Sequence, residues 1–258
     1  MKGLQPTRRV DQGRGHRYLL DGEPCDGVTW VKDNGIAKPA LIGWAANVTA
    51  DYAVDNWDEL AAMKHSERLA VLKRARWADR DAAAKRGTEV HRLAHLLALG
   101  EEIDVPEELE DHVAAYLRFA DDWLPTELLV EVVVGNREWR YMGTLDVVAD
   151  LRDGQRWLLD FKTNRRGPYQ EDALQLAAYR FADFYLDAAG VEKPMPEVDA
   201  VGIVWLHAEG YELIPVKADQ ATFTTFLYAK QVARFVESPR EAFLGEALGR
   251  PAAQGVTA

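Results

Sequence analysis

Three charged residues stand in otherwise apolar stretches in the middle of the chain. Asp160 and Lys162 are two residues apart in "LLDFKTN" (158–164), and Asp146 lies upstream in "YMGTLDVV". Side chains alternate between the two faces of a β-strand, so we expect Asp160 and Lys162 on one face. If the two segments are neighbouring strands, Asp146 is expected close to Asp160 on that face.

This arrangement allows two chemical interpretations. Two close carboxylates repel unless a positive charge pairs with them, and a divalent cation such as Mg²⁺ or Mn²⁺ takes hard oxygen ligands of this kind. A lysine beside such an ion, here Lys162, would stabilise a pentavalent phosphate or orient an attacking water. The alternative is a buried Asp–Lys ion pair, which stabilises a protein only weakly. The three residues alone leave both interpretations open.

The segments that carry these residues are predicted to be sequential antiparallel strands. The ranges 126–135, 137–151 and 156–164 are rich in Val, Leu, Trp and Tyr, with turn residues between them. The apolar spacing predicts helices over 38–56, 58–78, 79–100, 105–124, 169–190 and 219–236, and strand pairs over 17–31 and 200–216. A break is expected near Ser66, and Asp219 is expected to cap the last helix.

This order of elements predicts a single α/β structural domain. Residues 1–84 are assigned to an N-terminal hairpin and helical extension, and 85–240 to the α/β core. Residues 241–258 end in "GRPAAQGVTA" and are expected to form a disordered tail.

Composition excludes several classes of protein. The single cysteine, Cys25, excludes an intrachain disulfide and a multi-cysteine iron–sulfur cluster. No run of about 18 apolar residues is present, so no transmembrane helix and no membrane partner are expected. The polar, basic N-terminus is unlike a secretory signal, and a cytoplasmic location is expected. No Walker sequence is present, so no ATP-driven motor is expected.

Charge is distributed unevenly along the chain. The net charge is −11, but residues 64–92 contain nine Lys or Arg and four acids, while residues 96–131 contain eleven acids and one base. A local basic stripe favours contact with phosphates more than the mean charge opposes it. The alternative is two solvated helix faces of opposite sign. The candidate DNA-binding residues in the stripe are Lys73, Arg74, Arg76, Lys85 and Arg86.

The ordered motifs in this part of the chain resemble one nuclease superfamily. "GTLD" (143–146), "DFKT" (160–163) and "QLAAY" (175–179) follow one another, with "GTEVH" (87–91) and a strand containing Glu131 upstream. The set resembles the PD-(D/E)XK nuclease superfamily, and within it the RecB-like branch of Cas4-type and phage exonucleases. The resemblance covers roughly residues 85–185 and implies a restriction-endonuclease-like core with a mixed central sheet flanked by helices. The iron–sulfur cysteines of several members of the branch are absent.

The resemblance implies a role for each motif residue. Asp146 and Asp160 would be metal-binding carboxylates for Mg²⁺ or Mn²⁺, Lys162 the catalytic lysine, and His91 and the backbone carbonyl of Phe161 further metal ligands. The other catalytic candidates are Glu131, next to the ion or on a second one, and Gln175 and Tyr179, which border the site. Gln175 and Tyr179 are four residues apart and share a helix face.

Several of these residues have simpler interpretations. His91 and His95 are also four residues apart, a spacing that suits zinc, but position 92 lacks the glutamate of that motif. His95 is expected to pack, Glu131 could end a strand, and Tyr179 could belong to the core. Two arginines, Arg165 and Arg166, follow the "DFKT" segment and are either phosphate contacts or merely exposed.

The function implied by the resemblance is a divalent-metal-dependent deoxyribonuclease. An exonuclease is favoured over a sequence-specific endonuclease, and the setting implied is phage or bacterial DNA recombination, repair or processing. The expected partner is DNA, with a recombinase, a single-strand-binding protein or a second copy of the chain as further candidates. The alternatives are a catalytically silent nuclease-like module that binds DNA or protein, and a scaffold protein.

Overall fold

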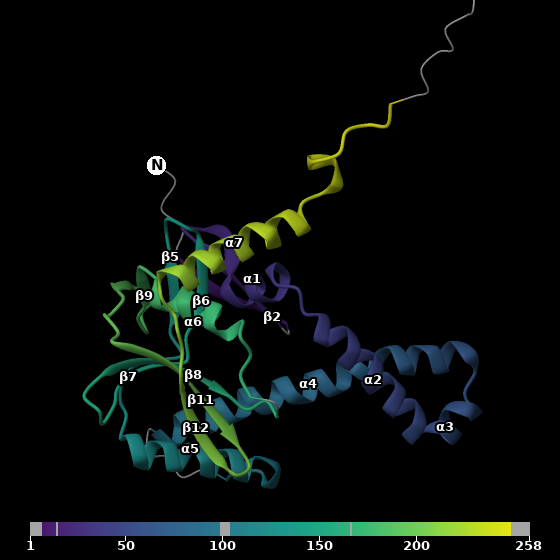
Figure 1. Ribbon diagram of the computed structural model, residues 1–258, viewed down its shortest axis with the longest axis horizontal. Helices are drawn as coiled ribbons and strands as arrows, with labels where there is room; N and C mark the ends of the chain where they lie inside the picture. The colour runs from purple at the N-terminus through teal and green to yellow at the C-terminus, as the bar shows by residue number, and fades with distance from the viewer. Residues whose placement is uncertain (1–6, 14, 99–103, 166, 249–258) are drawn as a thin grey trace, which may run out of the picture.

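Two mixed β-sheets with helices packed around them form the protein (Figure 1). The computed structural model describes residues 7–13, 15–98, 104–165 and 167–248. One sheet has five strands in the order β12 (Gly210–Pro215), β11 (Ala200–His207), β8 (Arg156–Lys162), β7 (Val147–Asp150) and β4 (Thr126–Val130). The other has seven, in the order β1 (Arg8–Gln12), β2 (Gly15–Leu20), β3 (Glu23–Gly27), β6 (Tyr141–Thr144), β5 (Val133–Asn136), β9 (Phe184–Leu186) and β10 (Glu192–Pro194). The predicted α/β class with a mixed sheet flanked by helices is confirmed.

The central strand β8 divides the core into two layers. It is antiparallel to β7 and parallel to β11. Its residues Trp157, Leu159 and Phe161 pack in a cluster with α5 (Glu110–Trp123), while Leu158 packs on the other face with α6 (Asp172–Arg180) and α7 (Gln220–Glu237). Since side chains alternate along a strand, Asp160 lies on the same face as Leu158, toward α6.

Two predicted strands each prove to be two strands, so the single ranges 126–135 and 137–151 are wrong. The first divides into β4 and β5 at Glu131, whose φ of 49° is left-handed, and the second divides into β6 and β7 at 145–146. The Glu131 N–H donates to the Asp146 carbonyl at 2.7 Å, and the Leu145 N–H donates to the Val132 carbonyl at 3.1 Å. The paired chains therefore bend together, leave one sheet and enter the other, with Asp146 at the corner.

The predicted helix over 169–190 is also wrong in its second half. Helix α6 ends at Arg180, and Phe184–Leu186 forms β9, which pairs antiparallel with β5. Phe184 and Leu186 are buried, and the Phe184 ring lies over Gly135, where a Cβ would meet it at 2.6 Å. Tertiary packing against β5 thus overrides the helical spacing of the sequence.

The predicted helices over 58–78 and 79–100 divide at a different place. A short helix α3 (Trp57–Ala62) is followed by one continuous 34-residue helix α4 (His65–Ala98). The break expected near Ser66 is confirmed at Met63–Lys64, where the Glu67 carboxylate accepts the Lys64 N–H at 3.4 Å as in one half of a capping box, whereas the predicted division between residues 78 and 79 is wrong. The assigned boundary between residues 84 and 85 lies inside α4.

The other predicted elements agree with the structure, with one exception. The 17–31 hairpin corresponds to β2 and β3 as far as Gly27, but its last part, 28–31, is wrong because these residues begin helix α1. The strand pair over 200–216 corresponds to β11 and β12, and Pro39 begins α2 (Pro39–Asp55). Asp219 caps α7 by accepting the Thr222 N–H at 3.0 Å. The remaining elements are α1 (Val28–Gly35) and two 3₁₀ turns, Glu107–Leu109 and Arg240–Ala242. Within the described ranges, no helix has the length and apolar character needed to cross a membrane.

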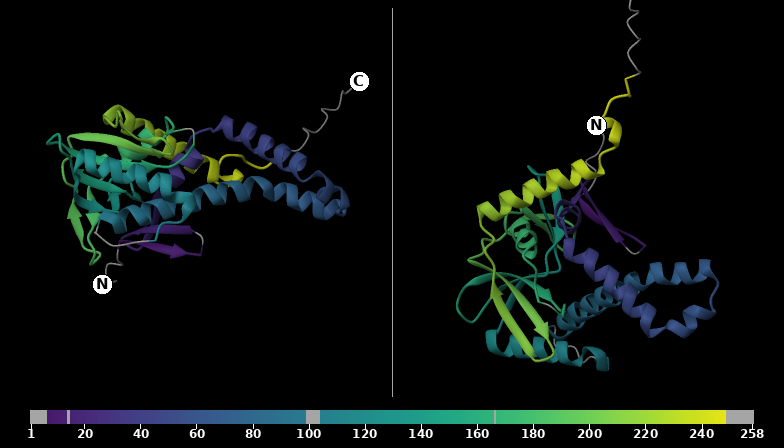
Figure 2. Two further views of the ribbon diagram at one scale, coloured as in Figure 1. Left: turned by 90° about the horizontal axis from the view of Figure 1, so that it is seen from below. Right: turned by 45° about the vertical axis from the view of Figure 1, so that its right-hand side comes forward.

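The N-terminal elements are joined to the core by strand pairing and by helix packing, among other contacts. Strand β3 pairs in parallel with β6, and α1 packs against α6 and α7. Helices α2 and α3 and the first part of α4 project from the core (Figures 1 and 2). Gly35 lets α1 and α7 approach closely, because a Cβ at that position would lie 2.1 Å from the Ala229 carbonyl oxygen.

We predict that Gly35→Ala destabilises the protein by about 1–3 kcal/mol, because the added methyl group would meet rigid helix backbone. Gly43→Ala is the matched control. No atom lies within 4 Å of a Cβ at Gly43 in α2, and Ala is the better helix former there. Urea unfolding followed by circular dichroism measures both. A Gly35→Ala variant as stable as Gly43→Ala would contradict this account of the α1–α7 contact.

Candidate active site

Asp146 takes the place of a backbone acceptor in the sheet. The β7–β8 ladder ends at the Val147–Leu159 pair because the chain turns at Asp146. The next inward-facing donor, the Phe161 N–H, donates to Asp146 Oδ2 at 2.8 Å. The carbonyl of a strand residue points to the same side as its N–H, so the Phe161 carbonyl faces the same corner. The strand break thus directs two different oxygens toward one point.

Asp160 is held between a lysine and a glutamine. The Asp160 side chain is 2% exposed, and its Oδ2 lies 2.5 Å from Lys162 Nζ. Its Oδ1 accepts a hydrogen bond from Gln175 Nε2 at 2.9 Å. Among the described residues, none donates a well-directed hydrogen bond to Oδ2, so its contact with Lys162 is an ion pair with poor hydrogen-bond geometry. One oxygen of a buried carboxylate is therefore fixed, and the other depends on charge alone.

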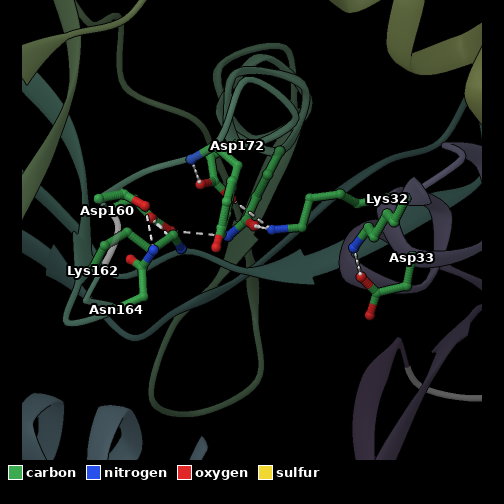
Figure 3. A network of polar contacts seen from close by, with 10 residues as sticks. Lys32, Asp33, Asp160, Lys162, Asn164 and Asp172 are labelled. Carbon is green, nitrogen blue, oxygen red and sulfur yellow. Dashed lines mark hydrogen bonds and ion pairs between the residues drawn. The ribbon is translucent and has the colours of Figure 1, made fainter. Parts of the chain in front are cut away.

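A second lysine extends this network to the N-terminal part of the chain. Lys32 on α1 donates to Gln175 Oε1 at 2.7 Å and to Asp172 Oδ1 at 2.8 Å. Asp172 Oδ2 accepts the Tyr169 N–H at 2.8 Å at the start of α6. Figure 3 shows the polar contacts running from Lys162 and Asp160, past Asp172, to Lys32. Lys32 fixes the orientation of the Gln175 amide, since its carbonyl must face the ammonium and its NH₂ group must face Asp160.

The charges of this cluster shift the pKa values of its members. Burial would lower the pKa of Lys162, but the nearby charges of Asp160, Asp172 and Asp146 outweigh it and raise the pKa above its ordinary value. Burial would raise the pKa of Asp172, but Lys32 and Lys162 lower it below its usual range. Lys162 is therefore an ammonium at neutral pH, suited to stabilising negative charge rather than to accepting a proton.

Tyr179 forms the wall of the site behind the carboxylates. Burial first, and then the charge of Asp160, raise the pKa of Tyr179 well above its ordinary value, so its hydroxyl stays neutral. Its ring lies against Gly143 of "GTLD", where a Cβ would meet Tyr179 Cε1 at 2.6 Å. Gly143 is thus needed for the close approach of α6 to β6.

The other predicted site residues are less directly involved or lie outside the described residues. Glu131 is at the corner, where its N–H bonds the Asp146 carbonyl, and its side chain is exposed. Arg165 is exposed just after β8, and Lys73 and Arg74 are exposed on α4. Outside the described part of the chain are the side chains of His91, His95, Arg76, Lys85 and Arg86, and residue 166.

The oxygens at the corner have the chemistry of a site for a hard divalent cation. Asp146 and Asp160 supply carboxylates and Phe161 a carbonyl, and the buried Asp160 Oδ2 is ion-paired with Lys162 but accepts no directed hydrogen bond from the described side chains. Among the described side chains, no three His, Cys, Asp or Glu gather as a metal-binding group. The donors fit Mg²⁺ or Mn²⁺ in their chemistry.

Lys32 and Asp172 belong to the cluster, and the sequence analysis missed both. Lys32 is separated from Asp172 by 140 positions, and no pattern in "VTWVKDNG" marks it as part of a site. Asp172 resembles an ordinary helix-start acid, since it occupies the first turn of α6. Only the packing of α1 on α6 joins them.

Comparison with known proteins finds likeness at the level of structure alone. No protein-family model and no curated protein matches the chain. A structure of SSO0001 is similar at 11% identity over 82% of this chain and 76% of that chain, with a TM-score of 0.34. LHK-Exo in complex with dAMP is similar at 13% over 83% and 88%, with a TM-score of 0.41. An alkaline exonuclease, LHK-Exo from Laribacter hongkongensis, is similar at 15% over 60% and 80%, with a TM-score of 0.34. Functional inference therefore rests on the geometry of the site.

We predict that Lys32→Met lowers the free energy of unfolding by about 3 kcal/mol at pH 7, because it leaves Asp172 a buried, poorly paired anion. Lys38→Met is the control, since its partner Asp33 is 53% exposed and the pair is worth less than about 1 kcal/mol.

The effect of Lys32→Met should depend on pH. The lowered pKa of Asp172 means that its ionised form stabilises the wild type above the ordinary carboxyl pKa of about 3.9. This stability is lost as pH falls through the lowered value. The difference in the free energy of unfolding between wild type and Lys32→Met should therefore become smaller below about pH 4. Chemical unfolding across this pH range measures it, and a difference that does not change with pH would contradict the pairing.

Proposed function

We propose that this protein is a divalent-metal-dependent deoxyribonuclease. The observation that carries the proposal is the corner itself, where Asp146, Asp160 and Lys162 meet on one side of β8 with oxygens of the kind that Mg²⁺ and Mn²⁺ prefer. Asp146, Asp160 and the Phe161 carbonyl would hold the ion, with His91 as a further ligand. When bound, the ion would polarise a phosphodiester and lower the pKa of a bound water.

The protein's own groups would orient and stabilise the reacting phosphate. Lys162 would place its ammonium next to the phosphate and stabilise the negative charge that develops there. Gln175 would keep Asp160 Oδ1 occupied, so that Oδ2 is the oxygen presented to the ion. Tyr179 would form the buried wall of the site. Glu131 would lie next to the ion, or bind a second one, at the exposed edge of the site.

An exonuclease in phage or bacterial DNA recombination, repair or processing is the more specific form of this proposal. It follows the resemblance of the motifs, and the described chain contains no separate domain for reading sequence. In this proposal the exposed Lys73 and Arg74 of α4, together with Arg165 after β8, contact DNA phosphates.

A catalytically silent binding module is the second candidate. The Asp160–Lys162 contact at 2.5 Å favours it, because the pair is satisfied electrostatically without any ion. In that case the fold would bind DNA or a protein without cutting. The two candidates differ in whether the purified chain cleaves DNA in Mg²⁺ or Mn²⁺.

We predict that Asp146→Asn and Asp160→Asn each reduce metal-dependent DNA cleavage by more than about 100-fold, because each removes a charged ligand. Asp150→Asn is the matched control, since Asp150 pairs with Arg156 at the far end of the same β7–β8 pair. End-labelled linear DNA and closed circular DNA of the same sequence, each with Mg²⁺, Mn²⁺ or chelator, are the substrates. Degradation of linear DNA alone supports an exonuclease. Failure of the wild type to cut either would reject the nuclease proposal and favour the binding module.

Measurements of metal affinity distinguish the predicted roles of His91 and His95. We predict that His91→Ala weakens Mn²⁺ binding in calorimetric titration by at least about tenfold, and that the affinity of the wild type falls as the imidazole protonates at low pH. His95→Leu should leave the affinity nearly unchanged. If His95→Leu loses the ion and His91→Ala keeps it, the assignment of His91 is wrong.

A further inference from the structure

The hairpin of β1 and β2 contacts the strand that leads to Asp146. Thr144, two residues before Asp146, makes a hydroxyl contact with the Tyr18 hydroxyl at 3.0 Å. Arg9 Nη1 donates to the same Thr144 hydroxyl at 3.4 Å. Thr144 and Asp146 are separated by one residue, so the hairpin contacts the chain next to the corner. Figure 2 shows the hairpin (purple) extending from the core.

The strand register decides which side chains of the hairpin lie on the face that contacts Thr144. Arg9 pairs with Tyr18 and Asp11 with His16, so these four side chains share one face. Arg8 lies on the opposite face, where it pairs with Leu19. The hairpin therefore presents one guanidinium toward Thr144 and directs its neighbour away.

The Arg9 guanidinium is placed to accept an anion. The Arg9 side chain is 37% exposed, its Nε donates to the Asp11 carboxylate at 2.9 Å, and its Nη1 donates to the Thr144 hydroxyl. No hydrogen bond from a described residue engages Nη2. Asp11 orients the side chain without burying it, since Asp11 itself is 75% exposed. Nε and Nη1 lie on different edges of the guanidinium, so Asp11 and Thr144 orient the group from two sides and leave Nη2 to donate a charge-assisted hydrogen bond to a phosphate.

The neighbouring cluster has a negative charge balance, which would repel a nucleic acid unless a cation at its edge attracted the backbone. Asp146, Asp160 and Asp172 are three anions against the two ammonium groups of Lys32 and Lys162, a balance of −1 next to the path of a polyanion. A cation at the edge of the cluster would hold the nucleic acid there without entering the ion pairs.

We propose that Arg9, with the hydroxyls of Thr144 and Tyr18, forms a phosphate-binding subsite for the nucleotide next to the cleaved phosphodiester. The ligand class is a nucleic-acid backbone phosphate. Hydroxyl and guanidinium donors of this kind position a strand without reading its sequence. The position of the subsite relative to a cleaved bond rests on the proposed nuclease function. The binding of a backbone phosphate by Arg9 does not.

Arg9→Gln and Arg8→Gln test the subsite as a matched pair. Each removes one positive charge from adjacent positions of the same strand, and only Arg9 faces Thr144. The probe is a short fluorescein-labelled single-stranded oligonucleotide, titrated at several salt concentrations in chelator so that no cleavage occurs. Arg9→Gln should weaken binding roughly five- to tenfold and reduce the salt slope by about 0.7, the value for one lost phosphate contact on a single strand. Arg8→Gln should change affinity by less than about twofold.

Equal losses of affinity in the two variants would overturn the subsite, because the effect would then come from net charge alone. An unchanged affinity in Arg9→Gln would overturn it as well, because Arg9 would then make no contact with the phosphate. Arg9→Lys should recover part of the affinity, since it keeps the charge but not the fork. Cleavage by the wild type is measured separately. A wild type that binds the oligonucleotide but never cuts would reject the nuclease function while leaving the Arg9 and Arg8 comparison to decide the subsite.

Discussion

The break in the paired strands at Glu131 and Asp146 is the constraint on which the rest of the site depends. A continuous strand through residue 146 would satisfy the Phe161 N–H with a backbone carbonyl and leave the Asp146 side chain no such role. Because the chain turns there, a carboxylate replaces the carbonyl at 2.8 Å. A buried N–H must have an acceptor, so the bend fixes Asp146 as firmly as the ladder fixes its neighbours. At the same bend the paired strands pass from one sheet to the other, from β4 to β5 and from β7 to β6, so the corner lies between the two sheets.

Burial of charge is the second constraint, and it explains why the N-terminal elements belong to the site. A carboxylate such as Asp160, with its side chain 2% exposed, is stable only when paired and hydrogen-bonded. Lys162 provides the pairing, Gln175 the hydrogen bond, and Lys32 the orientation of Gln175. The network ends at Lys32, whose helix is packed against α7 at Gly35. Residues 28–35 therefore help to build the site, although they lie far from it in sequence.

The sequence predicts the parts of the site that depend on local geometry. Alternation along a strand is sufficient to place Asp160 and Lys162 on one face, and the ion pair between them agrees with that prediction. The neighbouring-strand argument brings Asp146 to the same region, as its bond to Phe161 shows. What local geometry cannot predict is the bend, because "LLVEVVV" and "TLDVVAD" are rich in β-forming residues and have no Gly or Pro at the turning residue. Nor can it predict the pairing of Lys32 with Asp172, or the strand at 184–186, since both depend on contacts between distant segments.

The central claim is that the corner formed by Asp146, Asp160 and the Phe161 carbonyl holds a divalent ion. Anomalous diffraction from crystals grown with Mn²⁺ tests it most directly, because the signal locates the ion without reference to activity. The account predicts one peak within coordination distance of both carboxylates, with Lys162 moved away from Asp160 Oδ2 to admit it. A map with no peak there, and with Lys162 still paired to Asp160 at saturating Mn²⁺, would contradict it.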